Sequence, residues 1–134
     1  MKAFFFAVSA ITLVIAGPAL AHHSNAWVDM KTEIILENAV VTQFQWTNPH
    51  TWIEIDVPDG KGGVKHWSIE NGSITGLARQ GWKRTALKPG DKIRRIAIHP
   101  MRSGDAGGSF VGLEFADGRT LGSPVDRPAP GATR

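Results

Sequence analysis

Residues 51–57 read Thr-Trp-Ile-Glu-Ile-Asp-Val, and the aliphatic side chains Ile53, Ile55 and Val57 recur at every second position. This period of two is typical of a β-strand that buries one face and exposes the other. The aliphatic face is therefore predicted to point into a core, with Trp52 and the two carboxylates on the outer face. An antiparallel sheet with one solvated side follows from this pattern.

The next segments predict a hairpin. Residues 58–63, Pro-Asp-Gly-Lys-Gly-Gly, are a turn cluster, and residues 65–70, Lys-His-Trp-Ser-Ile-Glu, return as a second alternating strand. If Ile55 faces Trp67 and Ile53 faces Ile69 across the hairpin, the remaining pairs follow. The expected cross-strand pairs are Ile53 with Ile69, Ile55 with Trp67, Asp56 with His66, and Trp52 with Glu70.

Three more strands and one short helix complete the pattern. Strands are predicted over residues 34–44, 93–98 and 110–115, and Ser73 is a plausible N-cap for a helix that Gly81 ends. Five strands with a helix between the third and fourth is the element order of an OB-fold, so we expect an all-β, OB-fold-like barrel. A split sandwich is the alternative. Residues 34–121 form the predicted barrel, 22–33 an extended segment before it, and 122–134 a disordered tail rich in Pro.

The N-terminus predicts export. Lys2 precedes an apolar run over residues 3–16, and Ala19-Leu20-Ala21 offers small residues at both positions of an A-x-A cleavage site. The run is shorter than the roughly 20 residues that span a bilayer. Residues 1–21 are therefore predicted to be a signal peptide, which places the mature protein in the periplasm or outside the cell with no stable membrane insertion.

Composition narrows the function classes. Without Lys2 the chain has 14 basic and 12 acidic residues, and no long basic run is present, so a nucleic-acid partner is not expected. Cysteine is absent, which excludes disulfides and a thiol nucleophile. No Gly-x-Ser-x-Gly motif or singled-out carboxylate pair occurs, so we expect a binding protein rather than an enzyme.

Several segments together resemble a known family. They are His22-His23-Ser24, Trp46-Thr47-Asn48-Pro49-His50, Glu70-Asn71-Gly72-Ser73, Leu77-Ala78-Arg79-Gln80-Gly81-Trp82 and Leu87-Lys88-Pro89-Gly90-Asp91. The chain from His22 to about Leu121 resembles small exported bacterial proteins that share one domain of unknown function. One departure is Ile74, where the family pattern has Pro. The resemblance implies a compartment and a set of residues, but no reaction.

Cleavage after Ala21 would leave His22 at the mature N-terminus, followed by His23. An N-terminal His can chelate copper through its amine and one ring nitrogen, and a further imidazole would complete a T-shaped ligand set. His50 is the third ligand that the family resemblance favours, and His22, His23 and His50 are the proposed metal ligands. The opposing interpretation is that the two histidines only keep the terminus soluble.

The choice of third ligand depends on the barrel. The sequence predicts His66 and His99 at one end, with the start of the first strand, and His50 at the other, which makes His99 or His66 the alternative ligand by proximity. His50 stays within reach, because residues 22–33 could extend up to about 36 Å. The simpler interpretations are a surface pair of His66 with Asp56, a strand end at His99 and a turn at His50.

A second hypothesis is a binding module without metal. OB-folds bind ligands on their second and third strands and on the loop after the first strand, with aromatic side chains as stacking surfaces. Trp46, Asn48 and Trp52 fall in these places and are the candidate ligand-binding residues. The ligand would be a sugar, another small molecule or a periplasmic protein partner. Trp46 could instead cap the barrel, and Trp67 and Trp82 are expected in the core.

Overall fold

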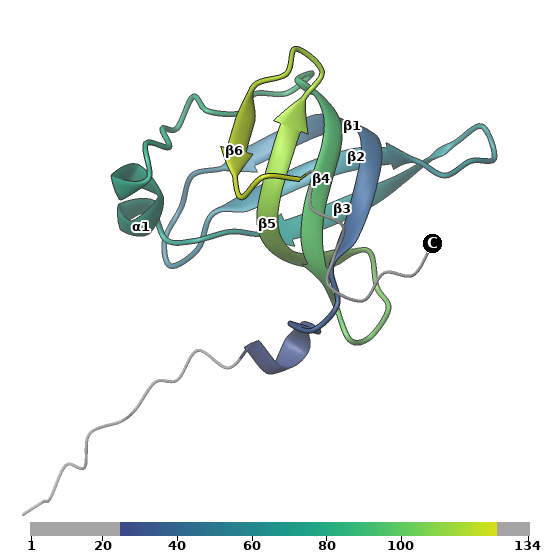
Figure 1. The fold of residues 1–134 in the computed structure, drawn as a ribbon, viewed down its shortest axis with the longest axis horizontal. Helices are drawn as coiled ribbons and strands as arrows, with labels where there is room; N and C mark the ends of the chain where they lie inside the picture. Colours follow the sequence, from purple (N-terminus) through teal and green to yellow (C-terminus); the bar gives the residue numbers. More distant parts are fainter. Residues whose placement is uncertain (1–24, 126–134) are drawn as a thin grey trace, which may run out of the picture.

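The computed structural model describes residues 25–125, and its strands β1 to β5 curve into a closed barrel (Figure 1). The elements in chain order are η1 (Asn25–Trp27), β1 (Ile34–Gln45), β2 (Trp52–Pro58), β3 (Val64–Glu70), α1 (Ile74–Arg79), β4 (Lys92–Pro100), β5 (Gly107–Phe115) and β6 (Thr120–Gly122).

The strand order confirms the predicted OB-fold-like barrel. Neighbouring strands follow the order β3-β2-β1-β4-β5-β6, and a parallel pairing of β3 with β5 closes the ring. The other strand pairs are antiparallel, and β6 extends the sheet beyond β5. The single α-helix of the described chain lies between β3 and β4, as the sequence predicts.

Strand β1 is long because it pairs with two strands, β4 and β2. Its first half pairs with β4, from Ile34 opposite Ile98, and its second half pairs with β2, up to Gln45 opposite Trp52. Asn38 lies between the halves with a φ of 56°, a left-handed conformation that Asn tolerates better than most residues. The bend lets one strand pass from the β4 side of the barrel to the β2 side.

The β2–β3 hairpin has the predicted register at every expected pair, including Asp56 opposite His66 and Trp52 opposite Glu70. Ile53, Ile55 and Ile69 are fully buried, so the alternating face does point into the core. The core also receives Trp82 and Leu77 from the helical connection. Packing of aliphatic side chains against these groups stabilises a chain that has no disulfide.

The helix and the turn after it also confirm the sequence prediction. The Ser73 side chain accepts a hydrogen bond from the backbone N–H of Gly76, so Ser73 is the N-cap. The Asp91 N–H donates to the Lys88 carbonyl at 3.1 Å, and Gly90 has a φ of 89°. A positive φ at the third residue is what a type II turn requires.

The structure differs from the prediction in the segment before the barrel and at the start of the predicted tail. The segment predicted as extended contains η1, and Val28 forms an isolated bridge with Met101 and is fully buried. In the predicted tail, Gly122 belongs to β6 and Val125 is buried, because an apolar side chain near the end of the sheet is removed from water. Residues 126–134 lie outside the described residues, as do residues 1–24.

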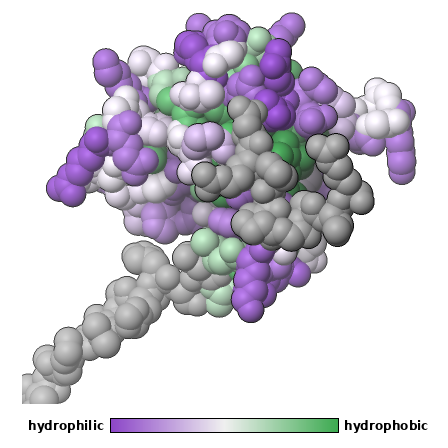
Figure 2. All heavy atoms as spheres, viewed as in Figure 1, coloured by the Kyte–Doolittle hydropathy of each residue, from purple (hydrophilic) through white to green (hydrophobic). Residues whose placement is uncertain are grey.

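The described surface is mostly polar. Figure 2 shows one face as largely hydrophilic, with small hydrophobic areas between polar side chains. Within residues 25–125, no helix combines the length and apolar character needed to cross a bilayer.

Candidate functional site

Two tryptophans from distant parts of the chain line one cleft. Trp27 is the last residue of η1, and Trp52 is the first residue of β2. Together with Ser68, Glu70, Met101, Ala106 and Gly107 they enclose about 290 Å³, which we call the Trp27–Trp52 cleft. Two indoles and a thioether give it an almost wholly apolar surface. Ser68 and Glu70 line it from the outer face of β3, but the Ser68 hydroxyl donates to Glu54 and the Glu70 carboxylate pairs with His50.

The N-terminal segment forms one wall of this cleft because the backbone fixes it to the loop after β4. The Asp29 N–H donates to the Pro100 carbonyl at 2.9 Å, and the Arg102 N–H donates to the Trp27 carbonyl at 3.0 Å. These bonds flank the Val28–Met101 bridge. These main-chain contacts hold the backbone of Trp27 in place.

Gly107 allows the close approach on the opposite wall. A Cβ on this residue would lie 2.8 Å from the Met101 sulfur and 2.9 Å from the Ser68 carbonyl oxygen. Gly107 is also the β5 partner of Ser68 where the barrel closes. The glycine therefore lets the Met101 side chain lie against the β3–β5 seam inside the cleft.

His50 lies at the edge of the same site. Its Nδ1 pairs with Oε1 of Glu70, and the Glu70 side chain is only 15% exposed. The preceding Asn48–Pro49 peptide bond is cis, and the Thr47 hydroxyl donates to the His50 carbonyl at 3.2 Å. Because Glu70 also lines the cleft, the imidazole of His50 and the two indoles share one neighbourhood of the barrel.

The other ligand-binding candidates fall outside the cleft. Trp46 packs edge-on against Phe44, with ring centroids 5.6 Å apart, and contacts the hydrophobic core. Asn48 is exposed in the turn. Of the three predicted residues, the cleft contains only Trp52. Trp27, Glu70 and Met101 were missed, because the pairings that join their segments are between residues distant in sequence.

His66 bridges two carboxylates on the outer face of the hairpin. Its Nδ1 lies 2.9 Å from Asp56, and its Nε2 lies 3.1 Å from Glu54. The hydrogen bond to Asp56, and then the one to Glu54, raise the pKa of His66 above its ordinary value. This is the predicted surface pair with a second carboxylate added, and it sits on an exposed part of the sheet.

The strand pairing corrects the predicted placement of the histidines. His99 pairs with Ser109, which pairs with Glu70, which pairs with Trp52, so His99 is in register with the strand positions beside His50. His66 instead pairs with Asp56, whose β1 partner Val40 faces Lys92 at the start of β4. The cause is the bent β1, which sets the end of β2 against the start of β4 rather than its end.

The metal-binding candidates are only partly within the described chain. His99 donates from Nδ1 to the Thr32 carbonyl at 2.8 Å, while His50 contacts Glu70. Among residues 25–125, no group of three or more His, Asp or Glu side chains is placed to hold a metal ion. His22 and His23 lie outside the described residues.

Comparison with known proteins places the chain in a family. A family model described as a family of unknown function (DUF6152) matches residues 10–110. The chain belongs to this family. The match includes every residue of the Trp27–Trp52 cleft and ends before β6. No curated protein and no solved structure matches the chain.

Proposed function

We propose that this protein is an exported β-barrel binding protein that holds a small ring compound in the Trp27–Trp52 cleft. The observation that carries the proposal is the placement of two indoles around one mostly apolar cleft of about 290 Å³. That volume is at the lower end of the range for ligand pockets, which suits one ring.

The chemistry of the cleft fits such a ligand. Indole faces pack against the flat apolar surface of a ring. Glu70 is fixed by His50, and its partner strand residue Trp52 holds one indole beside it. The ligand would therefore meet a site whose walls are already in place, which lowers the entropy cost of binding.

A fluorescence titration of the mature protein with a panel of monosaccharides and small aromatic compounds tests this function. We expect tryptophan quenching that saturates, and a loss of about tenfold or more in affinity in Trp52→Ala. Trp46→Ala is the matched control, since Trp46 packs on Phe44 outside the cleft. Equal affinity of Trp52→Ala and the parent protein, or no saturable response to any compound, would overturn the proposal.

A second candidate function is copper binding at a mature N-terminus that begins with His22. The observation that favours it is the position of Trp27, which brings the N-terminal segment to the cleft that contains Glu70, the partner of His50. His22 precedes Trp27 by five residues, a span of at most about 17 Å. This reach supports His50, which pairs with Glu70 at the same cleft, as the third ligand.

Copper binding at the N-terminus requires a free, deprotonated amine. The amine must lose its proton to bind the metal, and its ordinary pKa is about 7.7–8.0, so affinity should fall in mild acid. Adding one Gly before His22 would remove the chelating pair but leave both imidazoles. We expect this extended protein to bind Cu(II) at least about tenfold more weakly, and unchanged affinity and visible spectrum would refute the terminal site.

The third ligand is tested by substitution. We expect His50→Gln to alter the Cu(II) spectrum and His66→Gln to leave it unchanged, because the Asp56 and Glu54 carboxylates hold His66 elsewhere on the hairpin. His99→Gln is the test of the alternative ligand. A spectrum unaffected by all three variants would leave the terminus itself as the whole site and contradict the role of His50. The mass of protein exported by its native route would show whether the chain starts at His22.

A further inference from the structure

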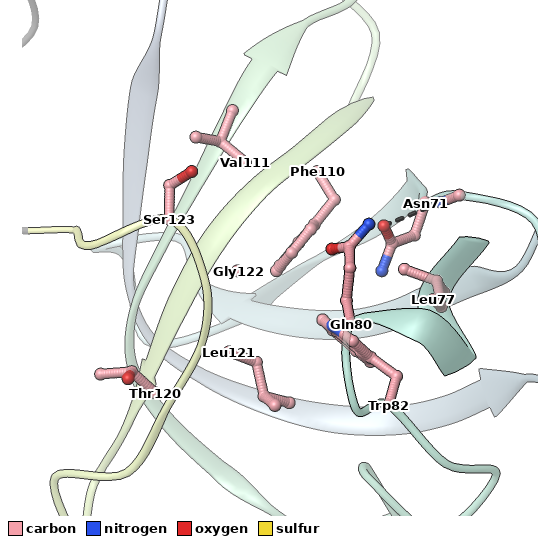
Figure 3. Close-up of a pocket in the computed structure, with 11 residues that line it drawn as sticks. Asn71, Leu77, Gln80, Trp82, Phe110, Val111, Thr120, Leu121, Gly122 and Ser123 are labelled. Carbon is pink, nitrogen blue, oxygen red and sulfur yellow. Dashed lines mark hydrogen bonds between the residues drawn. The ribbon is translucent and has the colours of Figure 1, made fainter.

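A second and larger hollow lies at the side of the barrel where α1 and β6 approach each other. It encloses about 680 Å³ and we call it the Asn71 pocket (Figure 3). Asn71 and Leu77 come from the helical connection side, and Phe110 and Leu121 come from β5 and β6. It shares no lining residue with the Trp27–Trp52 cleft, so the two are separate sites.

Backbone hydrogen bonds hold Asn71 firmly. Its N–H donates to the Thr51 carbonyl at 2.8 Å, and both the N–H and the hydroxyl of Thr51 donate to the Gly72 carbonyl, at 3.1 and 3.0 Å. Thr51 is itself fully buried. Three hydrogen bonds therefore join the dipeptide Asn71-Gly72 to Thr51, just before β2. The Asn71 side chain extends from this fixed backbone.

The orientation of the Asn71 amide is also fixed. The Gly72 N–H donates to Oδ1 of Asn71 at 2.8 Å, drawn as the dashed line in Figure 3. Exchanging the amide oxygen and nitrogen would place two donors against each other, so the oxygen must face Gly72. The nitrogen Nδ2 then faces the other way, and in Figure 3 it points between the side chains of Gln80 and Leu77.

This nitrogen has no hydrogen-bond partner among the described residues, and it is shielded from solvent. A buried donor without an acceptor costs about 1–3 kcal/mol, and folded proteins seldom leave one unmatched. Gln80, which is exposed, lies next to it at the pocket and can rotate away. Such a rotation would open the donor to a molecule in the pocket.

The walls of the pocket define the type of molecule. Trp82 and Phe110 meet edge to face with centroids 5.4 Å apart, and Leu121 adds an aliphatic surface. The lining residues Asn71, Gln80, Thr120 and Ser123 are polar but uncharged, and no lining side chain carries a charge. A charged ligand would lose its hydration without gaining a counter-charge, so the pocket favours a neutral one.

We propose that the Asn71 pocket binds an uncharged small molecule of the carboxamide class. Its carbonyl oxygen accepts the hydrogen bond from Nδ2 of Asn71, and its apolar body lies against Phe110 and Leu121. Gln80 turns aside on entry and can bond the amide group of the ligand. This second site does not depend on the function proposed for the Trp27–Trp52 cleft.

Benzamide is the probe for the test, with ¹⁵N-labelled mature protein followed by NMR. We expect saturable shifts in the Asn71 side-chain amide, the Gly72 N–H and the Trp82 indole. Benzoate has the same shape with a charge, and toluene has no carbonyl. Both should bind at least about tenfold more weakly than benzamide.

Asn71→Asp keeps the acceptor for Gly72 and replaces the donor by an oxygen, so benzamide affinity should fall by about tenfold or more. Asn48→Asp makes the same change at an exposed residue and should leave affinity unchanged. Should Asn71→Asp fail to fold, Gln80→Ala provides the second test, since widening the entrance should preserve or strengthen binding. The proposal is overturned by equal affinity in folded Asn71→Asp, by loss of binding in Gln80→Ala, by shifts confined to Trp27 and Trp52, or by no shifts at all.

Discussion

Substituting Gly112 by Ala should destabilise the barrel sharply, because the backbone of Ser123, the residue after β6, lies directly over it. A Cβ on Gly112 would fall 1.9 Å from the Ser123 carbonyl oxygen and 2.9 Å from the Ser123 carbonyl carbon. Both are backbone atoms and cannot swing aside as a flexible side chain could. Ordinary contact needs about 3.4 Å or more, so the chain around Ser123 must move by about 1.5 Å.

The size of the effect follows from this movement. Inserting a methyl group into a packed site costs about 1–3 kcal/mol. A shift of about 1.5 Å also breaks the 3.0 Å bond from the Ser123 N–H to the Val111 carbonyl, which adds about 1 kcal/mol. We expect a loss of about 3 kcal/mol in the free energy of unfolding. For a domain near 100 residues this lowers Tm by about 12 °C or more.

Urea unfolding of the mature protein, followed by tryptophan fluorescence, measures this loss. Gly76→Ala is the matched control: the nearest atom to its Cβ is the Ser73 hydroxyl oxygen at 3.3 Å, and Ala is favoured in a helix by about 1 kcal/mol. We expect Gly76→Ala to be neutral or stabilising. If Gly112→Ala changed stability by less than about 1 kcal/mol, the packing of β6 over β5 would not be as described.

Two further predictions concern the hairpin and the helix. The raised pKa of His66 stabilises the fold fully below the ordinary histidine pKa, and this stability is lost as pH rises through the folded-state pKa. The free energy of unfolding should therefore fall less between pH 6 and pH 8.5 in His66→Gln than in the parent protein, by well under 1 kcal/mol because the pair is exposed. Identical pH profiles of the two proteins would refute this. Ser73→Ala removes the N-cap bond to Gly76 and should cost about 1 kcal/mol in the same urea assay, whereas Ser73→Asp, which restores an acceptor, should recover most of it.

The local pattern predicted most of the fold. The alternation through Ile53, Ile55 and Ile69 set which face of the hairpin is buried, and aligning these faces across the turn gave the pairs that the structure has. Ser73 and Gly90 were recognisable because capping and a positive φ restrict the residue type at a single position. These features depend on near neighbours in the chain, and their chemistry can therefore be deduced without knowing the rest of the structure.

The candidate sites were predicted only in part. The outward direction of Trp52 follows from the strand period, whereas only the packing shows that Trp46 lies on Phe44, as its alternative interpretation as a cap of the barrel implies. His99 does lie beside the start of β1, but His66 rather than His50 is at the opposite end, because the bend of β1 at Asn38 decides which halves of β2 and β4 face each other. The unmatched Nδ2 of Asn71 gave no signal in the sequence at all.

By itself the sequence determined an all-β barrel with one capped helix, its hairpin register and a prediction of export. Tertiary structure decided which distant segments meet: Trp27 with Trp52, His50 with Glu70, and β6 with the residues around Asn71. The physical reason is the distance along the chain over which each effect acts. Periodicity and turn chemistry act over a few residues, whereas a cleft is formed where strands remote in sequence close a ring, and that closure depends on the packing of the whole core.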